Sequence, residues 1–195
     1  MQRTQSDIDR RRRRRRRRIQ VILIYSALAL GTAWFFESQA TTTVIFVRHA
    51  EKSKLPKGDP SLTDAGRRRA AELARQLVDA DVIAGVDAIY STSYRRTEET
   101  AQPVADALNL LVIPYDASNT ETIIDEIVKA HKGQVILVVG HRNTIPKMIA
   151  NMGASKKVPD FDGDEYDNIY IVSIPWFGKT KTIRLRYGTP YVPAE

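Results

Sequence analysis

Val135–His141 (VILVVGH) and Val44–His49 (VIFVRH) are two short apolar runs, and each ends in a histidine. Continuous apolar runs of this length are typical of strands that a sheet buries on both faces. In an open α/β sheet, ligands bind at the carboxyl ends of the strands, so we expect the two imidazoles to meet at one edge. The segment VILVV is the most apolar of the chain and is expected at the sheet centre.

Apolar runs and amphipathic helical patterns alternate around these two segments, which is typical of an α/β domain with a largely parallel sheet. Helices are expected over residues 65–78 (with Thr63 or Asp64 as N-cap), 93–108, 120–131 and 143–152. Further strands are expected over residues 87–91 and 110–113, the latter stopped by Pro114. Residues 168–174 and 180–186 alternate with period two and predict an antiparallel edge hairpin. The expected fold is a three-layer α/β/α sandwich, preceded by one N-terminal transmembrane helix.

The basic character of the chain is confined to its N-terminus. The first 40 residues carry ten arginines, nine of them in the run Arg10–Arg18, and three acidic residues. The remaining 155 residues, which contain the domain expected over residues 41–190, carry 20 basic and 20 acidic side chains and are neutral together. No aromatic residues interleave with the arginines, so we interpret the arm of residues 1–18 as a binder of anionic lipid head groups, with no nucleic-acid partner. The chain contains no cysteine, which excludes disulfides and thiolate metal sites.

The segment Ile19–Phe36 contains 18 residues without a charge and predicts a membrane span. A helix of that length reaches roughly 27 Å, enough for one crossing with little tilt. The arginines before it place the N-terminus in the cytoplasm and the following domain on the extracytoplasmic (periplasmic) side. A signal peptide is the alternative, since Ser38-Gln39-Ala40 is an acceptable cleavage site and cleavage after Ala40 would release a secreted domain.

A third segment, Tyr90–Ala101 (YSTSYRRTEETA), begins at a predicted strand end and continues into a predicted helix. It places an arginine, Arg95 or Arg96, near the helix start and at the edge expected for Arg48 and the two histidines. Such a concentration of cationic groups in a neutral domain is suited to a dianion, and nearby helix N-termini add N–H donors.

Four motifs together resemble those of the histidine phosphatase superfamily, which includes phosphoglycerate mutases, and in particular its small bacterial phosphatase branch. Phe46–Ala50 is similar to the Arg-His-Gly signature, Leu62–Gly66 to the Leu-(Thr/Ser)-x-x-Gly segment, and Val138–His141 to the second-histidine motif. In the Ser-x-x-x-Arg-x-x-x-Thr-Ala segment, the spacing back from Thr100 selects Arg96 as the family arginine. Two residues depart from the pattern: Ala50 replaces glycine, and Arg142 replaces a small residue, either adding a cation at the pocket mouth or pointing to solvent.

The resemblance implies a metal-independent and cofactor-independent phosphatase. His49 would attack phosphorus in a small phosphorylated substrate or phosphoprotein and form a phosphohistidine that water hydrolyses. Arg48, Arg96 and His141 would hold the phosphoryl oxygens, with Asn143 as a further substrate-binding residue.

The residues leave two candidates for the proton donor to the leaving group. The resemblance places an acid at Asp116, which a turn after Pro114 would equally explain, and Glu51 is the alternative. His131 is interpreted as a surface or capping residue. Specificity is expected from three loops, residues 51–62, 116–120 and 155–166.

Two other functions remain open from the sequence. One is a phosphoglycerate-mutase-type phosphotransferase, although the glutamate that serves as its general acid has no clear counterpart. The other is a catalytically weak phosphate-binding module at the membrane.

Overall fold

The computed structural model describes residues 5–38, 41–79, 85–154, 158–159 and 161–193. The chain divides into two compact units at the junction between Ala40 and Thr41. The predicted cleavage site after Ala40, and residues 155–157 and 160 of the third expected specificity loop, lie outside the described residues.

The first unit contains a single helix, α1 (Gln5–Ser38), of 34 residues. The arginine run and the apolar segment therefore lie in one continuous helix. Its part Arg10–Phe36 is long and apolar enough to cross a membrane, and none of that segment is buried. A signal sequence near an N-terminus has the same length and composition, so both interpretations of the segment fit this helix.

The second unit is built on a mixed six-stranded sheet in the order β3-β2-β4-β1-β5-β6. Its strands are β1 (Thr41–Arg48), β2 (Ala88–Thr92), β3 (Val112–Tyr115), β4 (Val135–Gly140), β5 (Asn168–Pro175) and β6 (Lys181–Arg186). The first four run parallel to one another, whereas β5 pairs antiparallel with both β1 and β6. The expected central position of VILVV and the expected edge hairpin are confirmed.

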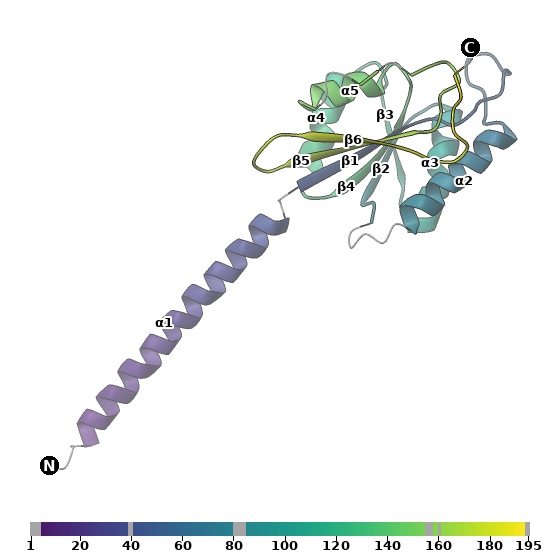
Figure 1. Cartoon of the computed structure of the whole chain (residues 1–195). Helices are drawn as coiled ribbons and strands as arrows, with labels where there is room; N and C mark the ends of the chain where they lie inside the picture. The colour runs from purple at the N-terminus through teal and green to yellow at the C-terminus, as the bar shows by residue number, and fades with distance from the viewer. Residues whose placement is uncertain (1–4, 39–40, 80–84, 155–157, 160, 194–195) are drawn as a thin grey trace. The chain divides into compact units, whose positions relative to one another are not determined.

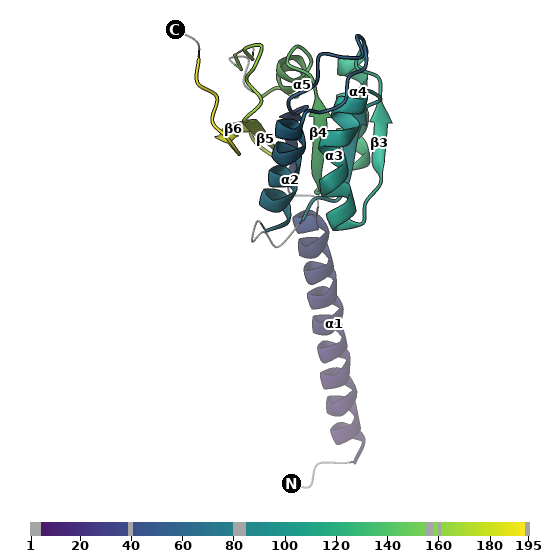
Figure 2. The same ribbon diagram turned by 90° about the vertical axis from the view of Figure 1, so that its right-hand side faces the viewer.

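Four helices cover the two faces of this sheet: α2 (Asp64–Val78), α3 (Arg95–Leu108), α4 (Thr120–Ala130) and α5 (Ile145–Asn151). Alternate residues of each strand point to opposite faces, so Phe46 and Val138 pack with α4 and α5. Val47 and Val139 pack on the other side with α2 and α3, which lie next to each other (Figures 1 and 2). The two apolar layers fix the register of the central strands and hence the position of the residues at their ends.

Three element boundaries differ from the sequence expectation. β3 does not stop before Pro114 but runs to Tyr115, because β3 is an edge strand in which the missing proline N–H costs no ladder bond. The helix expected from residue 93 begins at Arg95, whose backbone N–H donates to Asp59 Oδ1 at 2.8 Å. The helix expected over 143–152 is shorter because residues 142–144 form a turn closed by bonds to the His141 carbonyl.

Candidate active site

His49 follows the last residue of β1 and is almost completely buried. Its Nδ1 lies 2.8 Å from the carbonyl oxygen of Ala50. Because a carbonyl only accepts hydrogen bonds, Nδ1 carries the proton and Nε2 keeps its lone pair. Burial, followed by the nearby Arg48, His141 and Arg96 side chains, lowers the pKa of the His49 imidazole to about 3. The side chain is therefore a neutral nucleophile at neutral pH.

The loop that follows His49 is held by the other two sequence motifs. Thr100 Oγ1 accepts the Ala50 N–H at 3.0 Å. Thr63, the N-cap of α2, donates its backbone N–H to the Glu51 carbonyl at 2.9 Å. A Cβ on Gly66 would overlap that same carbonyl, which explains the glycine of the Leu-Thr-Asp-Ala-Gly motif. The fully buried methyl group of Ala50, in place of the family glycine, packs in a small apolar cluster.

Arg48 is clamped by backbone carbonyls of a loop that is more than 110 residues away in the sequence. Its Nη1 donates to Asp162 O and Glu165 O, both at 2.9 Å, and its Nη2 donates to Gly163 O at 2.7 Å. The guanidinium also stacks on Tyr166, with Cζ 4.1 Å from the ring centroid. Only Nε, which is buried without a hydrogen-bond partner in the described part of the chain, and one N–H of Nη2 remain for a ligand.

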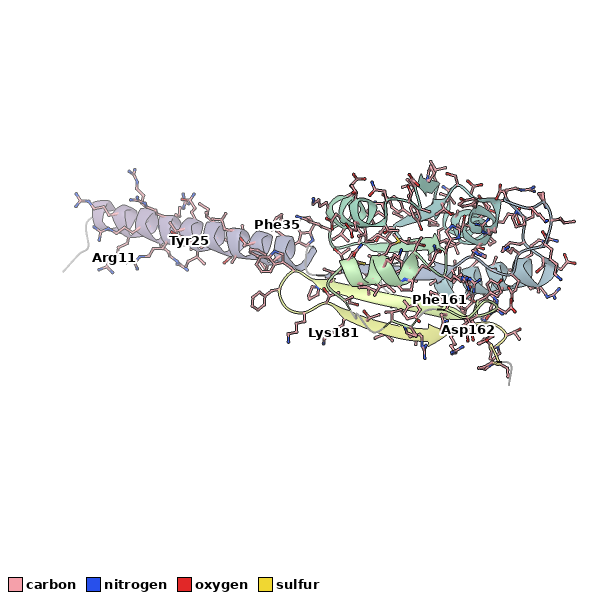
Figure 3. All side chains as sticks on the ribbon, turned by 90° about the horizontal axis from the view of Figure 1, so that it is seen from above. Arg11, Tyr25, Phe35, Phe161, Asp162 and Lys181 are labelled. Atoms are coloured by element: carbon pink, nitrogen blue, oxygen red, sulfur yellow. The ribbon has the colours of Figure 1, made fainter. Side chains whose placement is uncertain are left out.

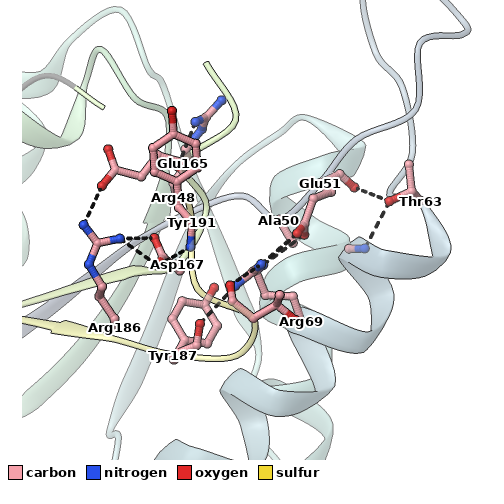
Figure 4. A network of polar contacts seen from close by, with 12 residues as sticks. Arg48, Ala50, Glu51, Thr63, Arg69, Glu165, Asp167, Arg186, Tyr187 and Tyr191 are labelled. Atoms are coloured by element: carbon pink, nitrogen blue, oxygen red, sulfur yellow. Dashed lines mark hydrogen bonds and ion pairs between the residues drawn. The ribbon is translucent and has the colours of Figure 1, made fainter. Parts of the chain in front are cut away.

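The carbonyl clamp is itself supported by the C-terminal part of the domain (Figure 4). Arg186 pairs with the buried carboxylate of Asp167 at 2.7 Å and with Glu165 at 3.2 Å. Asp167 also accepts the Tyr191 N–H at 2.9 Å, and the Tyr191 hydroxyl donates to Asp162 Oδ2 at 3.1 Å. The position of the Arg48 charge is therefore set by residues that never contact the cavity.

Arg96 lies in the first turn of α3 and is held much more loosely. Its nearest protein acceptors are Gly58 O, at 3.4 Å from Nη1, and Asp59 Oδ1, at 4.0 Å. The guanidinium stacks on Tyr94, with Cζ 4.2 Å from the ring centroid. Its Nε is also buried and has no partner among the described residues. Most of its donors are therefore available to a ligand.

His141 follows β4, and hydroxyl groups determine which of its nitrogens faces the cavity. Thr97 donates its hydroxyl to backbone carbonyls, so its oxygen accepts from Thr92 Oγ1 at 2.7 Å. Thr92 in turn accepts from His141 Nε2 at 3.1 Å, which leaves Nδ1 for a bound group. Burial, together with the charges of Arg96 and Arg48, lowers the pKa of His141 to about 4. The ring is therefore neutral at neutral pH without a bound anion, and a dianion would favour its protonation.

The four residues brought together at the strand ends line one cavity of about 400 Å³. The two imidazole centroids are 5.5 Å apart. Lys52, Ser118, Arg142 and Asn143 also line this cavity. Arg142 is exposed yet sits at the cavity mouth, which combines the two alternatives for this residue. Among the described residues the cavity wall includes four permanent cations and no carboxylate.

Neither candidate acid reaches into this cavity. Glu51 is bound by Arg69, with Arg69 Nε at 2.9 and 3.0 Å from its two oxygens. Asp116 is exposed and accepts from the Ser118 backbone N–H at 2.8 Å and the Ser118 hydroxyl at 2.7 Å, which lower its pKa. It lines a neighbouring hollow of about 520 Å³ beside Tyr115. Both carboxylates are therefore bound by structural partners outside the cavity.

The remaining histidine, His131, has a structural environment. It caps the C-terminus of α4, and its Nε2 lies 2.9 Å from the Tyr90 hydroxyl. Its Nδ1 lies 2.7 Å from Gln134 Oε1. The capping role expected from the sequence agrees with this geometry, although the ring is half-buried.

The sequence interpretation missed the aromatic walls of the site. Tyr166 stacks on Arg48 and lies 5.8 Å from the His49 ring, whereas Tyr94 stacks on Arg96 and lies 5.3 Å from the His141 ring. Arg48 and His49 thus contact the same tyrosine, Tyr166, and Arg96 and His141 contact Tyr94. Only the position of Tyr94, two residues before Arg96 in the motif, offered a signal in the sequence.

Comparison with known sequences gives a family match and a curated relative. Residues 44–119 match the model of the histidine phosphatase superfamily, branch 1. Phosphoserine phosphatase 1 of Hydrogenobacter thermophilus is 39% identical over 79 residues, which are 37% of this chain and 36% of that protein. The chain thus spans about a third of that curated relative.

Two solved structures share the fold. The protein histidine phosphatase SixA, complexed with tungstate, has a TM-score of 0.60 at 18% identity, covering 74% of this chain and 96% of SixA. A mutant of phosphoserine phosphatase from Entamoeba histolytica, in complex with phosphoserine, has a TM-score of 0.52 at 16% identity, covering 75% of this chain and 96% of that chain. Over residues 44–119 this chain is therefore similar to the histidine phosphatase superfamily, and its second unit shares the fold of these solved structures.

Proposed function

We propose that the chain is a phosphatase that hydrolyses phosphorylated substrates through a phosphohistidine on His49. One observation carries this proposal: the buried Nε–H groups of Arg48 and Arg96 have no acceptor within the described residues. A buried donor without an acceptor costs about 1–3 kcal/mol, and an anion between the two guanidinium groups would satisfy both. The neutral imidazole of His49 lies in the same cavity.

The reaction proposed for this site has two steps. In the first, His49 Nε2 attacks phosphorus in line, the P–N bond forms and the bond from phosphorus to the leaving group breaks. Arg48, Arg96 and a His141 protonated in the complex hold the phosphoryl oxygens through N–H donors. In the second step, water attacks the phosphohistidine, releases inorganic phosphate and restores the neutral imidazole. Asn143 is proposed to contact the substrate from the cavity wall.

The substrate proposed for this site has a leaving group that departs without strong acid catalysis. Glu51 and Asp116 are bound by Arg69 and Ser118 and do not line the cavity, so neither is placed to give a proton to the leaving group. Phosphohistidine and aryl phosphates release such leaving groups, and SixA, one of the similar structures, is a protein histidine phosphatase. Phosphoserine is the comparison substrate, because two of the similar proteins are phosphoserine phosphatases.

The enzyme is further proposed to be tethered to a membrane by residues 19–36, with its catalytic domain on the extracytoplasmic side. The apolar part of α1 and the arginines that precede it support this topology. The arginine run would then contact anionic lipid head groups in the cytoplasmic leaflet. Cleavage after Ala40 would give a secreted enzyme instead.

Hydrolysis of p-nitrophenyl phosphate by the full chain in detergent, with a chelator present, tests the proposal. We expect His49→Ala to lower kcat by at least about 10³-fold, because the covalent route is removed. His131→Asn is the matched control, since this histidine lies outside the cavity, and it should keep the wild-type rate within a few fold.

Two outcomes would redirect the proposal. Equal rates for wild type and His49→Ala would remove it. Stabilisation by inorganic phosphate without turnover of any phosphorylated compound would instead favour a binding module, whereas dependence on a bisphosphate primer would favour a mutase.

A further inference from the structure

The turn of the β5–β6 hairpin carries the two aromatic side chains that are most exposed on the second unit. Between Pro175 and Lys181, Trp176 is 70% exposed and Phe177 is 89% exposed. Lys179, in the same turn, and Lys181, at the start of β6, are exposed cations. Apolar side chains of this size at a hairpin tip add nothing to the core, so their exposure calls for another function.

The strand register places this turn at the end of the sheet opposite the site. Thr41, the first residue of β1, pairs with Pro175, and β1 then runs toward Arg48 and His49. Figure 3 shows Lys181 close to the hairpin turn and Asp162, in the loop that clamps Arg48, toward the other end of the domain. The turn and the cavity therefore lie at opposite ends of the sheet.

The same register places the turn at the end of the sheet where β1 begins, at Thr41. Thr41 follows Phe36 by five residues, and an extended chain of five residues spans at most about 18 Å. If residues 19–36 cross a membrane, the end of the domain that carries Trp176 and Phe177 cannot lie far from the bilayer surface. Other parts of the domain have no such restriction from the chain.

The residue types of the turn fit the interface between lipid and water. Tryptophan and other aromatic rings are enriched at head-group level, where an apolar body and a polar tip are both accommodated. Lysine side chains beside them reach toward phosphate groups, and each contributes about 1 kcal/mol near an anionic surface. A contact with a soluble protein would give no reason for the aromatic residues and lysines to lie at the end of the sheet where β1 begins.

We propose that the turn of residues 176–181 inserts its aromatic side chains into the head-group region of an anionic bilayer and so gives the domain a second membrane contact. This inference rests on the membrane tether in the proposed function. A tether alone would leave the domain free to rotate, whereas two contacts fix its orientation.

The fixed orientation has a consequence for the substrate. The eight residues of β1 rise about 3.3 Å each, so the cavity is held roughly 20–25 Å from the turn, at the end of the sheet far from the lipid. The site is then presented to soluble phosphorylated molecules and phosphoproteins, and lipid phosphates of the same membrane are out of its reach.

The chain contains only two tryptophans, Trp34 in α1 and Trp176 in the turn, which allows each contact to be measured separately. Full-length Trp34→Phe and Trp176→Phe are reconstituted in vesicles of phosphatidylglycerol and phosphatidylcholine, with acyl chains brominated near the glycerol or unbrominated. Bromine quenches indole fluorescence on contact. In the Trp34→Phe variant, which retains only Trp176, we expect the brominated lipid to quench the indole fluorescence. We also expect the emission to lie at shorter wavelength than that of the same variant unfolded in urea without detergent.

The two variants distinguish failure of the inference from failure of the tether. Quenching of Trp34 without quenching of Trp176 would overturn the inference and leave the tether standing. Absence of quenching at both positions would remove the tether and, with it, the inference.

A charge reversal tests the contribution of the lysines. In the Trp34→Phe background, Lys179→Glu with Lys181→Glu should reduce the quenching of Trp176 several-fold in anionic vesicles. Lys54→Glu with Lys57→Glu makes the same change of charge in the loop after His49, at the other end of the domain, and should leave the quenching unchanged. If both pairs of substitutions reduced the quenching of Trp176 equally, the result would contradict a specific contact between the turn and the lipid.

Discussion

The two arginines of the cavity carry the same charge but are held in different ways. Arg48 gives three N–H groups to backbone carbonyls of a distant loop, at 2.7–2.9 Å. Arg96 has no acceptor nearer than 3.4 Å among the described residues. The difference separates two tasks: Arg48 joins the C-terminal part of the domain to the site and places a fixed charge, whereas Arg96 offers most of its donors to the ligand.

Replacement of each arginine by lysine gives the largest expected effects and tests this division directly. Both variants should lose about 10²-fold or more in kcat/KM for p-nitrophenyl phosphate, because the planar donor pair is lost. Arg48→Lys should also lower the free energy of unfolding by about 1–3 kcal/mol, since carbonyls of the clamp lose their partners. Arg96→Lys should change it by less than about 0.5 kcal/mol. Urea unfolding measures this difference, and equal losses of stability would break the comparison.

The cost of placing two imidazoles between these arginines should appear as a loss of stability in acid. His49 and His141 have folded pKa values of about 3 and about 4, below the unfolded value of about 6.5. The folded protein therefore stays neutral while the unfolded chain binds protons, so stability is intact above pH 6.5 and falls as the pH decreases. Each histidine contributes up to about 1.4 kcal/mol per pH unit in this window. His49→Asn and His141→Asn should each flatten the slope in urea unfolding between pH 6.5 and 5, and unchanged slopes would contradict the prediction.

Arg142 is the third arginine that lines the cavity, and unlike the buried Arg48 it is exposed. We expect Arg142→Ser to raise KM by about 3–10-fold with little change in kcat, because an exposed charge attracts the dianion without contacting the transition state. The effect should shrink at high ionic strength, since screening reduces exposed charges most. Arg75→Ser, an equal loss of charge near the C-terminus of α2, is the control and should leave KM unchanged.

The smallest effect on kcat is expected for Asp116, which the sequence suggested as the proton donor. Asp116→Asn should change kcat by less than about 3-fold for both p-nitrophenyl phosphate and phosphoserine, because Ser118 holds the carboxylate as an anion. A loss of about 100-fold with phosphoserine alone would show that Asp116 is the proton donor after all, which the alkyl leaving group requires and the aryl one does not.

Several features of the fold and site could be read from the sequence because they depend on local patterns. Apolar runs identified the central strands, and the rule that ligands bind at their carboxyl ends brought His49 and His141 to one edge. The motif spacing selected Arg96 over Arg95, and the structure places Arg96 in the cavity. The period-two pattern located the edge hairpin, although not the importance of its turn.

Other features required the tertiary structure because they join residues that are distant in the chain. The clamp on Arg48 is made by main-chain carbonyls, which leave no side-chain signal, and its support comes from Arg186 and Tyr191. Pro114 was expected to end the third strand but lies inside it. Proline is tolerated there because β3 is an edge strand, and only the tertiary structure decides which strand lies at the edge. The sequence by itself determined which residues reach the ends of the strands. Only the packed structure decided which of their donors remain free, because each hydrogen bond used within the protein is withdrawn from the ligand.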